Sequence, residues 1–146
     1  MLKVERGDPA AVREILALLA AAELPIRGLV ADETTILLTA SDHEGPVGAA
    51  AVERYEADGL LRSVVVAERL RGEGIGRRLV ASAEAVAADS GVGSLYLLTE
   101  GADAFFAQLG YRRVDRDEVP PAVQASEEYS VLCPVDATVM MKRLNG

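Results

Sequence analysis

Residues 71–78 read RGEGIGRR and combine a flexible backbone with positive charge. Glycine occupies every second position from Gly72 to Gly76, between the hydrophobic run 60–67 and a segment with helical periodicity. Residues 69–78 contain four arginines and one glutamate, hence a net charge of +3 inside a chain of net charge −8. Backbone N–H groups at the start of a helix lack partners within the helix, and the helix dipole favours anions there. We therefore predict that this loop binds a polyanion, specifically a pyrophosphate group.

Two known phosphate-binding patterns do not fit this loop. Its G-x-G-x-G spacing differs from the G-x-G-x-x-G of dinucleotide-binding folds, and no lysine follows it as in the Walker loop. The alternative is that the glycines only permit a tight turn between a strand and a helix, with the arginines in solvent. One glycine would be enough for that turn, and the additional glycines and arginines favour a ligand site.

The elements that must position this loop follow from the hydrophobic periodicity and from Gly and Pro signals. Strands are expected at 2–6, 34–40, 47–55, 60–67, 94–99, 111–114 and 138–144, and helices at about 8–23, from the glycine loop to about Ser90, at 102–110 and from Pro120. Turns are expected at 42–46 and 57–59. Gly91 is expected to end the long helix in a left-handed conformation. The order predicts an α/β (α+β) fold with a mixed, mostly antiparallel sheet of six to seven strands and helices on both faces.

Composition restricts the class of protein. The 146 residues predict a single domain over 1–146, and the negative net charge and 4% aromatic content argue against nucleic-acid binding. No signal peptide or membrane-spanning segment is expected. The single cysteine, Cys133, favours a reducing, cytoplasmic location, and the single histidine, His43, gives no reason to expect a metal site.

The segment Arg71–Gly76 resembles the R/Q-x-x-G-x-G/A signature of the GNAT superfamily of acyl-CoA-dependent N-acyltransferases. The surrounding order agrees, from the hydrophobic strand before the loop to Leu109-Gly110-Tyr111, where the family has L-G-F/Y. The resemblance covers most of the chain and implies the GNAT fold with acetyl-CoA as cofactor. It also implies that strand 94–99 splays away from strand 60–67 and so opens a slot for the thioester. The implied cofactor-binding residues are Val64, Val65, Val66, Arg71, Gly72, Glu73, Gly74, Ile75, Gly76, Arg77, Thr99, Phe105 and Phe106.

A narrower resemblance concerns the C-terminal half. Segments 61–63, 96–99, 105–111, 115–120 and 132–134, with Met140, are similar to the arsenic-resistance N-acetyltransferases associated with arsinothricin, an arsenic analogue of glutamate. This resemblance implies acetylation of the α-amine of such a compound. Glu100-Gly101 departs from the branch, which has small polar residues at that place.

N-acetylation requires a neutral amine, a group that takes its proton, a stabilised oxyanion and a proton for the departing thiolate. The family commonly has a tyrosine general acid five residues before the aromatic of its G-F/Y pair, but here that residue is Phe106. That role is therefore not transferred, and water, Ser63, Tyr55 or Tyr129 could supply the proton. Glu53 is the first candidate for the base, directly or through water, and Glu23 is the second. The resemblance implies an oxyanion donor in a backbone N–H near Val65.

An anionic acceptor suits arginine clamps. Arg62 is the strongest candidate because a charge in mid-strand should be paired or functional. The full set of candidate acceptor-binding residues is Glu23, Arg27, Arg54, Tyr55, Arg62, Ser63, Ser126 and Tyr129. The alternatives are acetylation of another small amine or of a peptide N-terminus, and a non-catalytic CoA-binding module. A homodimer through a sheet edge or the last strand is compatible with the sequence.

Overall fold

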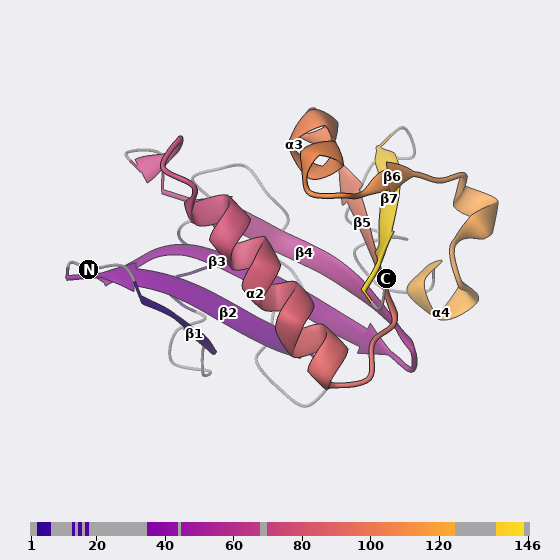
Figure 1. Cartoon of the computed structure of the whole chain (residues 1–146), viewed down its shortest axis with the longest axis horizontal. Coiled ribbons are helices and arrows are strands. Elements are labelled where there is room, and N and C mark those ends of the chain that lie inside the picture. The colour runs from indigo at the N-terminus through magenta and orange to yellow at the C-terminus, as the bar shows by residue number, and fades with distance from the viewer. Residues whose placement is uncertain are drawn as a thin grey trace.

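The computed structural model describes residues 3–6, 13, 15, 17, 35–43, 45–67, 70–124 and 137–144. Its elements are β1 (Lys3–Arg6), β2 (Thr35–Asp42), β3 (Gly45–Tyr55), β4 (Asp58–Val66), α2 (Ile75–Asp89), β5 (Ser94–Thr99), α3 (Asp103–Gln108), β6 (Arg112–Arg113), the 3-10 turn η2 (Arg116–Glu118), α4 (Pro121–Gln124) and β7 (Thr138–Arg143). Figure 1 shows α2 lying across one face of the strands.

The strands of the described residues form one seven-stranded sheet, in the order β1-β2-β3-β4-β5-β7-β6. Each neighbouring pair is antiparallel except β4 and β5, which are parallel because α2 lies between them in the chain. The mixed, mostly antiparallel sheet predicted from the sequence is therefore confirmed. The last strand, β7, is paired on both sides, so the edges of the sheet are β1 and β6.

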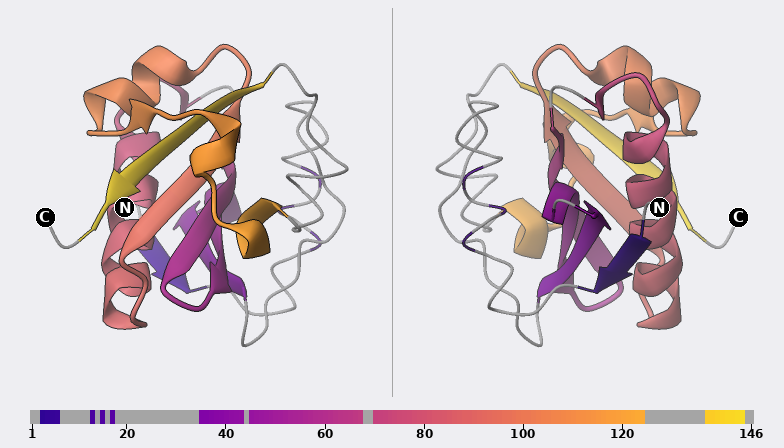
Figure 2. Two further views of the ribbon diagram at one scale, coloured as in Figure 1. Left: turned by 90° about the vertical axis from the view of Figure 1, so that its right-hand side faces the viewer. Right: turned by 90° about the vertical axis from the view of Figure 1, so that its left-hand side faces the viewer.

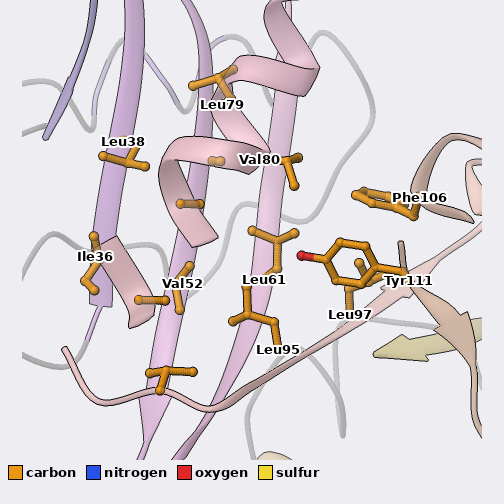
Figure 3. Close-up of a cluster of buried hydrophobic side chains, with 14 of the residues drawn as sticks. Ile36, Leu38, Val52, Leu61, Leu79, Val80, Leu95, Leu97, Phe106 and Tyr111 are labelled. Atoms are coloured by element: carbon orange, nitrogen blue, oxygen red, sulfur yellow. The ribbon is translucent and has the colours of Figure 1, made fainter. Parts of the chain in front are cut away.

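The larger hydrophobic core lies between the sheet and α2. Alternate strand residues point to one face, and those facing α2 include Ile36, Leu38, Val52, Leu61, Leu95 and Leu97 (Figure 3). Helix α2 contributes Ile75, Leu79, Val80, Ala83 and Ala87 at i, i+4, i+5, i+8 and i+12, which is one helical face.

The opposite face of the sheet has its own cluster. Leu60, Tyr96, Val139 and Met141 point to this face and pack with Val119 and with Val123 of α4. Figure 2 shows α2 and α4 on opposite sides of the strands. The prediction of helices on both faces is confirmed by these two helices. The helix expected at 8–23 lies mostly outside the described residues, although Arg13, Ile15 and Ala17 are helical within it and Ile15 is fully buried.

Helix α2 ends as its sequence predicts. Gly91 has φ +95°, the Val92 N–H donates to Ala87 O at 3.0 Å, and the Gly91 N–H donates to Ala88 O at 3.1 Å. This pair of hydrogen bonds ends the helix as expected when a glycine in the left-handed conformation follows the C-cap.

The turn predicted over 57–59 is displaced. The chain reverses at Glu56 and Ala57, and Gly59 lies within β4, paired with Arg54. Gly59 is there because of close packing, since a Cβ on it would lie 2.9 Å from Leu95 Cδ2. The glycine that suggested a turn is therefore required by the core between β4 and β5.

Candidate cofactor groove and acceptor face

A groove opens where β4 and β5 separate. The two strands pair only over Asp58–Leu60 and Ser94–Tyr96, and beyond these residues they diverge (Figure 1). The end of β4, the loop before α2, the first turn of α2 and part of α3 enclose a volume of about 520 Å³. The lining residues are Val64, Val65, Val66, Leu70, Arg71, Gly72, Gly74, Ile75, Gly76, Arg77, Ala102 and Phe105.

This groove brings together most of the predicted cofactor residues. Glu73, Thr99 and Phe106 are the predicted residues that do not line it. Leu70 and Ala102 line it and were missed, because a leucine and an alanine in loops carry no chemical signal in a sequence. The divergence of β4 and β5 is the opening that the family resemblance implied.

The glycine loop lines the groove and leads into the start of α2. Gly72 and Gly74 have φ of +88° and +82°, a region that side-chain-bearing residues rarely adopt. Gly74 is the N-cap of α2, no side chain caps this end, and the first turn contains no acidic residue. The first-turn N–H groups of α2 and the positive end of its dipole can therefore interact with an anion in the groove.

Two arginines lie on either side of this helix end. Arg71 Nε donates to Val66 O at 3.2 Å, which folds the loop back on β4. Arg77 Nη2 donates to Gln108 Oε1 at 3.1 Å, which connects α2 to α3. Both hydrogen bonds are exposed, and both arginines line the groove. Arg78 is exposed and outside the lining, and Arg69 lies outside the described residues.

The two adjacent phenylalanines have different places. Phe105 lines the groove close to Gly76, where a Cβ would lie 3.3 Å from the Phe105 ring. Phe106 is only 7% exposed and belongs to the core, with its ring edge-on to Phe105 at 5.0 Å and to Tyr111 at 5.7 Å between centroids. Of the two implied cofactor contacts, Phe105 therefore lies in the groove, whereas Phe106 packs in the core.

Short contacts hold α3, the far wall of the groove, in place. The Ala102 N–H donates to Thr99 Oγ1 at 3.3 Å, which connects the end of β5 to the start of α3. Asp103 forms an ion pair with Arg113 of β6, and this hydrogen bond lowers the pKa of the Asp103 carboxyl. Thr99 thus connects β5 to α3 and does not line the groove itself.

A β-bulge lies at the groove end of β4. Ala49 pairs with Val65 and Ala51 with Arg62, so one residue of β3 stands opposite two of β4, Ser63 and Val64. Ser63 has φ +60°, a left-handed conformation that costs a serine roughly 1–3 kcal/mol. The extra residue allows both Arg62 and Ser63 to reach the same side, where Arg62 Nε donates to Ser63 Oγ at 3.2 Å.

The face of the sheet opposite α2 carries the polar candidates. Arg62 Nη1 donates to Glu53 Oε2 at 3.0 Å, and Tyr55 Oη donates to Glu53 Oε1 at 2.7 Å. The Arg62 side chain is 0% exposed and that of Glu53 is 11% exposed. The structure thus brings Glu53, Tyr55, Arg62 and Ser63 into one hydrogen-bonded group beside the groove.

Arg54 is separated from this group by the sheet. Strand alternation places it on the same side as Val52, which packs against α2, and its Nε is buried without a hydrogen-bond partner. The structure therefore does not bring Arg54 together with the other acceptor candidates. Glu23, Arg27, Ser126 and Tyr129 lie outside the described residues.

Two features are absent from the described residues. No three His, Cys, Asp or Glu side chains in this part of the chain lie together as metal ligands would. No helix within the described ranges has the length and hydrophobicity to cross a membrane.

The sequence is similar to a family of known proteins. Residues 32–113 match the family described as acetyltransferase (GNAT) domain. An N-acetyltransferase of Chlorobaculum tepidum, itself uncharacterised, is 35% identical over 85 residues, which are 57% of this chain and 54% of that protein. The N-alpha-acetyltransferase 80 of Mus musculus is 47% identical over 53 residues, 36% of this chain and 17% of the mouse protein.

Solved structures share the fold. The N-acetylglutamate synthase of Neisseria gonorrhoeae, crystallised with coenzyme A and L-arginine, superimposes with a TM-score of 0.81 at 19% identity. The superposition covers 99% of this chain and 34% of the synthase. The chain thus spans about half of the Chlorobaculum relative and a third of the synthase.

Proposed function

The chain belongs to the GNAT family of acetyltransferases, and we propose that it transfers an acetyl group from acetyl-CoA to the α-amine of a small, anionic, amino-acid-like compound. The acceptor in this proposal is arsinothricin or a related glutamate analogue. The observation that carries it is the groove between β4 and β5, which ends at the uncapped N-terminus of α2 between Arg71 and Arg77.

The groove suits coenzyme A in its charge and shape. Backbone N–H groups and arginines at one end match a diphosphate, and the hydrophobic walls formed by Val64, Val66 and Phe105 match a pantetheine chain. Backbone groups of Val64–Val66 would pair with the pantetheine amides as a neighbouring strand would. When bound, the cofactor supplies a thioester whose carbonyl carbon an amine can attack.

The residues beside the β4 bulge are suited to the proton transfers. In the proposed mechanism Glu53 takes the proton of the acceptor amine, directly or through water. The backbone N–H near Val65 donates to the oxygen on which negative charge develops. Ser63 directly precedes Val64, which lines the groove, and its hydroxyl would pass a proton to the departing thiolate and regain one from water, in place of the tyrosine that Phe106 replaces.

The choice of acceptor rests on resemblance and on charge. The similarity of the C-terminal half to the arsenic-resistance branch supports a glutamate analogue, and so does the overlap with a synthase named for N-acetylglutamate. Arg27 is the proposed partner for an acceptor carboxylate. Arg62 contributes positive charge to the same face, although Glu53 already pairs with it.

A second acceptor class is favoured by one observation. The mouse relative is named as an N-alpha-acetyltransferase, which makes a peptide N-terminus the alternative acceptor. A non-catalytic CoA-binding module is the rival outside the enzyme class. A homodimer in the cytoplasm is proposed along with the activity, with β1 or β6 as the edge available for pairing.

The deciding experiment measures thiol release from acetyl-CoA with arsinothricin, phosphinothricin, glutamate and a panel of N-terminal peptides. Turnover above the blank with the glutamate analogues is the expected result. Turnover with peptides alone would replace the acceptor, and thermal stabilisation by CoA with no turnover for any acceptor would support the binding module. Glu53→Gln then tests the base, since glutamine can still accept the hydrogen bonds from Arg62 or Tyr55 but takes no proton.

A further inference from the structure

Among the described residues, Arg62 has the most deeply buried charged side chain, and its Nη1 and Nε atoms both form hydrogen bonds within the protein. Its side chain has no exposed surface, Nη1 bonds to Glu53 and Nε bonds to Ser63 Oγ. An arginine that binds a diffusing acceptor must offer part of its guanidinium to the solvent-filled site. The geometry of Arg62 is better suited to holding protein than to holding a ligand.

We infer that the Glu53–Arg62 pair is a clamp that fixes the β4 bulge, and that Arg62 is a positioning residue rather than an acceptor ligand. This inference rests on the proposed acetyl transfer for its kinetic consequence. The clamp acts through Ser63. The Ser63 hydroxyl accepts a hydrogen bond from Arg62 Nε, and the Ser63 backbone has φ +60°.

The bulge needs such a clamp because regular pairing competes with it. Without the extra residue, each residue after Ser63 would move to the other face of the sheet. Val64 and Val66, which line the groove and pack against the α2 core, would then exchange places with Val65. The backbone N–H near Val65, which is the proposed oxyanion donor, would be displaced with them.

The two roles for Arg62 predict different kinetics. An acceptor ligand, when replaced by lysine, would raise the KM for the acceptor and change kcat little. A clamp would lower kcat, because the oxyanion donor is misplaced, and leave the acceptor KM near the wild-type value. Arg62→Lys keeps the charge beside Glu53 and removes the planar fork that also reaches Ser63.

Glycine at position 63 separates the clamp from its target. Because glycine adopts positive φ without strain, Ser63→Gly should keep the bulge without help from Arg62, whereas Ser63→Ala keeps the strain and loses the hydrogen bond. We expect Ser63→Gly to restore near-wild-type amide exchange in the Arg62→Lys protein. Both position 63 variants lack the hydroxyl, so a difference between them reports on the backbone and not on proton donation.

The test measures amide hydrogen exchange across residues 62–66 in the unliganded protein, together with steady-state kinetics, for Arg62→Lys, Ser63→Ala, Ser63→Gly and the double variant Arg62→Lys/Ser63→Gly. The control is Arg112→Lys, an exposed arginine on β6. We expect residues 62–66 of Arg62→Lys and Ser63→Ala to exchange their amide hydrogens at least about tenfold faster than wild type. In these two variants kcat should fall by at least about tenfold. Ser63→Gly and the double variant should keep amide exchange within about threefold of wild type.

Wild-type exchange in both Arg62→Lys and Ser63→Ala would overturn the clamp, as would a raised acceptor KM at constant kcat. If Arg62→Lys does not fold, the comparison of Ser63→Ala with Ser63→Gly decides the question, because neither alters the ion pair. If the wild-type protein shows no turnover with any acceptor, the proposed function fails. The exchange measurement still supports or refutes the clamp in that case.

Discussion

Tyr111 and Glu84 join the turn after α3 to the middle of α2, with Tyr111 Oη donating to Glu84 Oε2 at 2.9 Å. Lys142 of β7 completes the group, since its Nζ donates to Glu84 Oε1 at 3.0 Å and to Leu109 O at 2.8 Å. The Leu109 carbonyl lies at the C-terminal end of α3. These bonds hold α3 against α2 and so set the position of the wall that Phe105 gives to the groove.

Removing the Tyr111 hydroxyl should destabilise the protein. Tyr111→Phe keeps the ring that packs against Phe106 and deletes one hydrogen bond to a carboxylate, which is worth about 1.5–3 kcal/mol. Urea unfolding measures this loss. Glu84 keeps its bond to Lys142 in the variant, so a loss far larger than this would show that the ring itself had moved.

The same hydroxyl should make stability depend on alkaline pH. Burial, and then the nearby Glu84 carboxylate, raise the pKa of Tyr111 above its ordinary value of about 10. Above that pH the unfolded chain loses this proton while the folded chain keeps it, so the free energy of unfolding falls as pH rises. Unfolding midpoints between about pH 9 and pH 11 should fall more steeply for wild type than for Tyr111→Phe. Parallel curves would contradict this.

Gly74→Ala should weaken cofactor binding. An alanine at φ +82° costs about 1–2 kcal/mol and tilts the first-turn N–H groups that are proposed to bind the diphosphate. Gly91→Ala is the matched control, because Gly91 has φ +95° at the other end of α2 and a Cβ there also meets open space. Both variants should lose similar stability, and calorimetry should show about tenfold weaker CoA binding for Gly74→Ala alone. Equal loss of binding in both would assign the effect to general destabilisation.

Arg77→Glu should weaken the binding of CoA and not that of pantetheine, which lacks the diphosphate. Arg77 lines the groove at the start of α2, so its reversal puts negative charge beside the proposed diphosphate site. We expect at least about tenfold weaker CoA binding at low salt, and less at high salt. Arg112→Glu changes the net charge equally on exposed β6 and should leave binding unchanged. Equal weakening for pantetheine would mean that the groove had changed shape.

Much of the fold could be predicted because local signals and global packing agree. The hydrophobic run 94–99, the helical stripe of α2 and the stop at Gly91 each specify their own element. The spacing of the glycines and the local positive charge predicted the glycine loop. Two of its three glycines have positive φ, which explains why glycine is needed there. Alternation along β3 would also have separated Arg54 from Glu53 and Tyr55, a signal that was present and not used.

The polar group beside the groove could not be predicted in the same way. The bulge depends on how β4 pairs with β3, and nothing in the segment Leu61–Val66 marks Ser63 as a left-handed residue. The hydrogen bond from Arg62 to Glu53 joins the neighbouring strands β4 and β3 and depends on their register. Whether Phe105 or Phe106 faces the groove depends on the rotation of α3, which is set by distant contacts such as those of Lys142.

Phe106→Tyr tests whether the missing tyrosine can be restored. The family commonly has a tyrosine acid at this position, but here the ring lies in the core and does not line the groove. A hydroxyl added to this ring would be buried among hydrophobic side chains and should cost about 1–3 kcal/mol of stability. Because it would not reach the thioester, kcat should stay within about twofold of wild type.

Phe105→Tyr is the comparison that makes this result informative. Its ring lines the groove, so a hydroxyl there can meet solvent or ligand and should cost little stability. A rise in kcat in Phe106→Tyr, with a new alkaline limb in the pH profile, would show that α3 rotates when cofactor binds and turns position 106 toward the thioester. An unchanged kcat and lower stability in Phe106→Tyr would show that the proton for the thiolate comes from elsewhere, with Ser63 as the next residue to test.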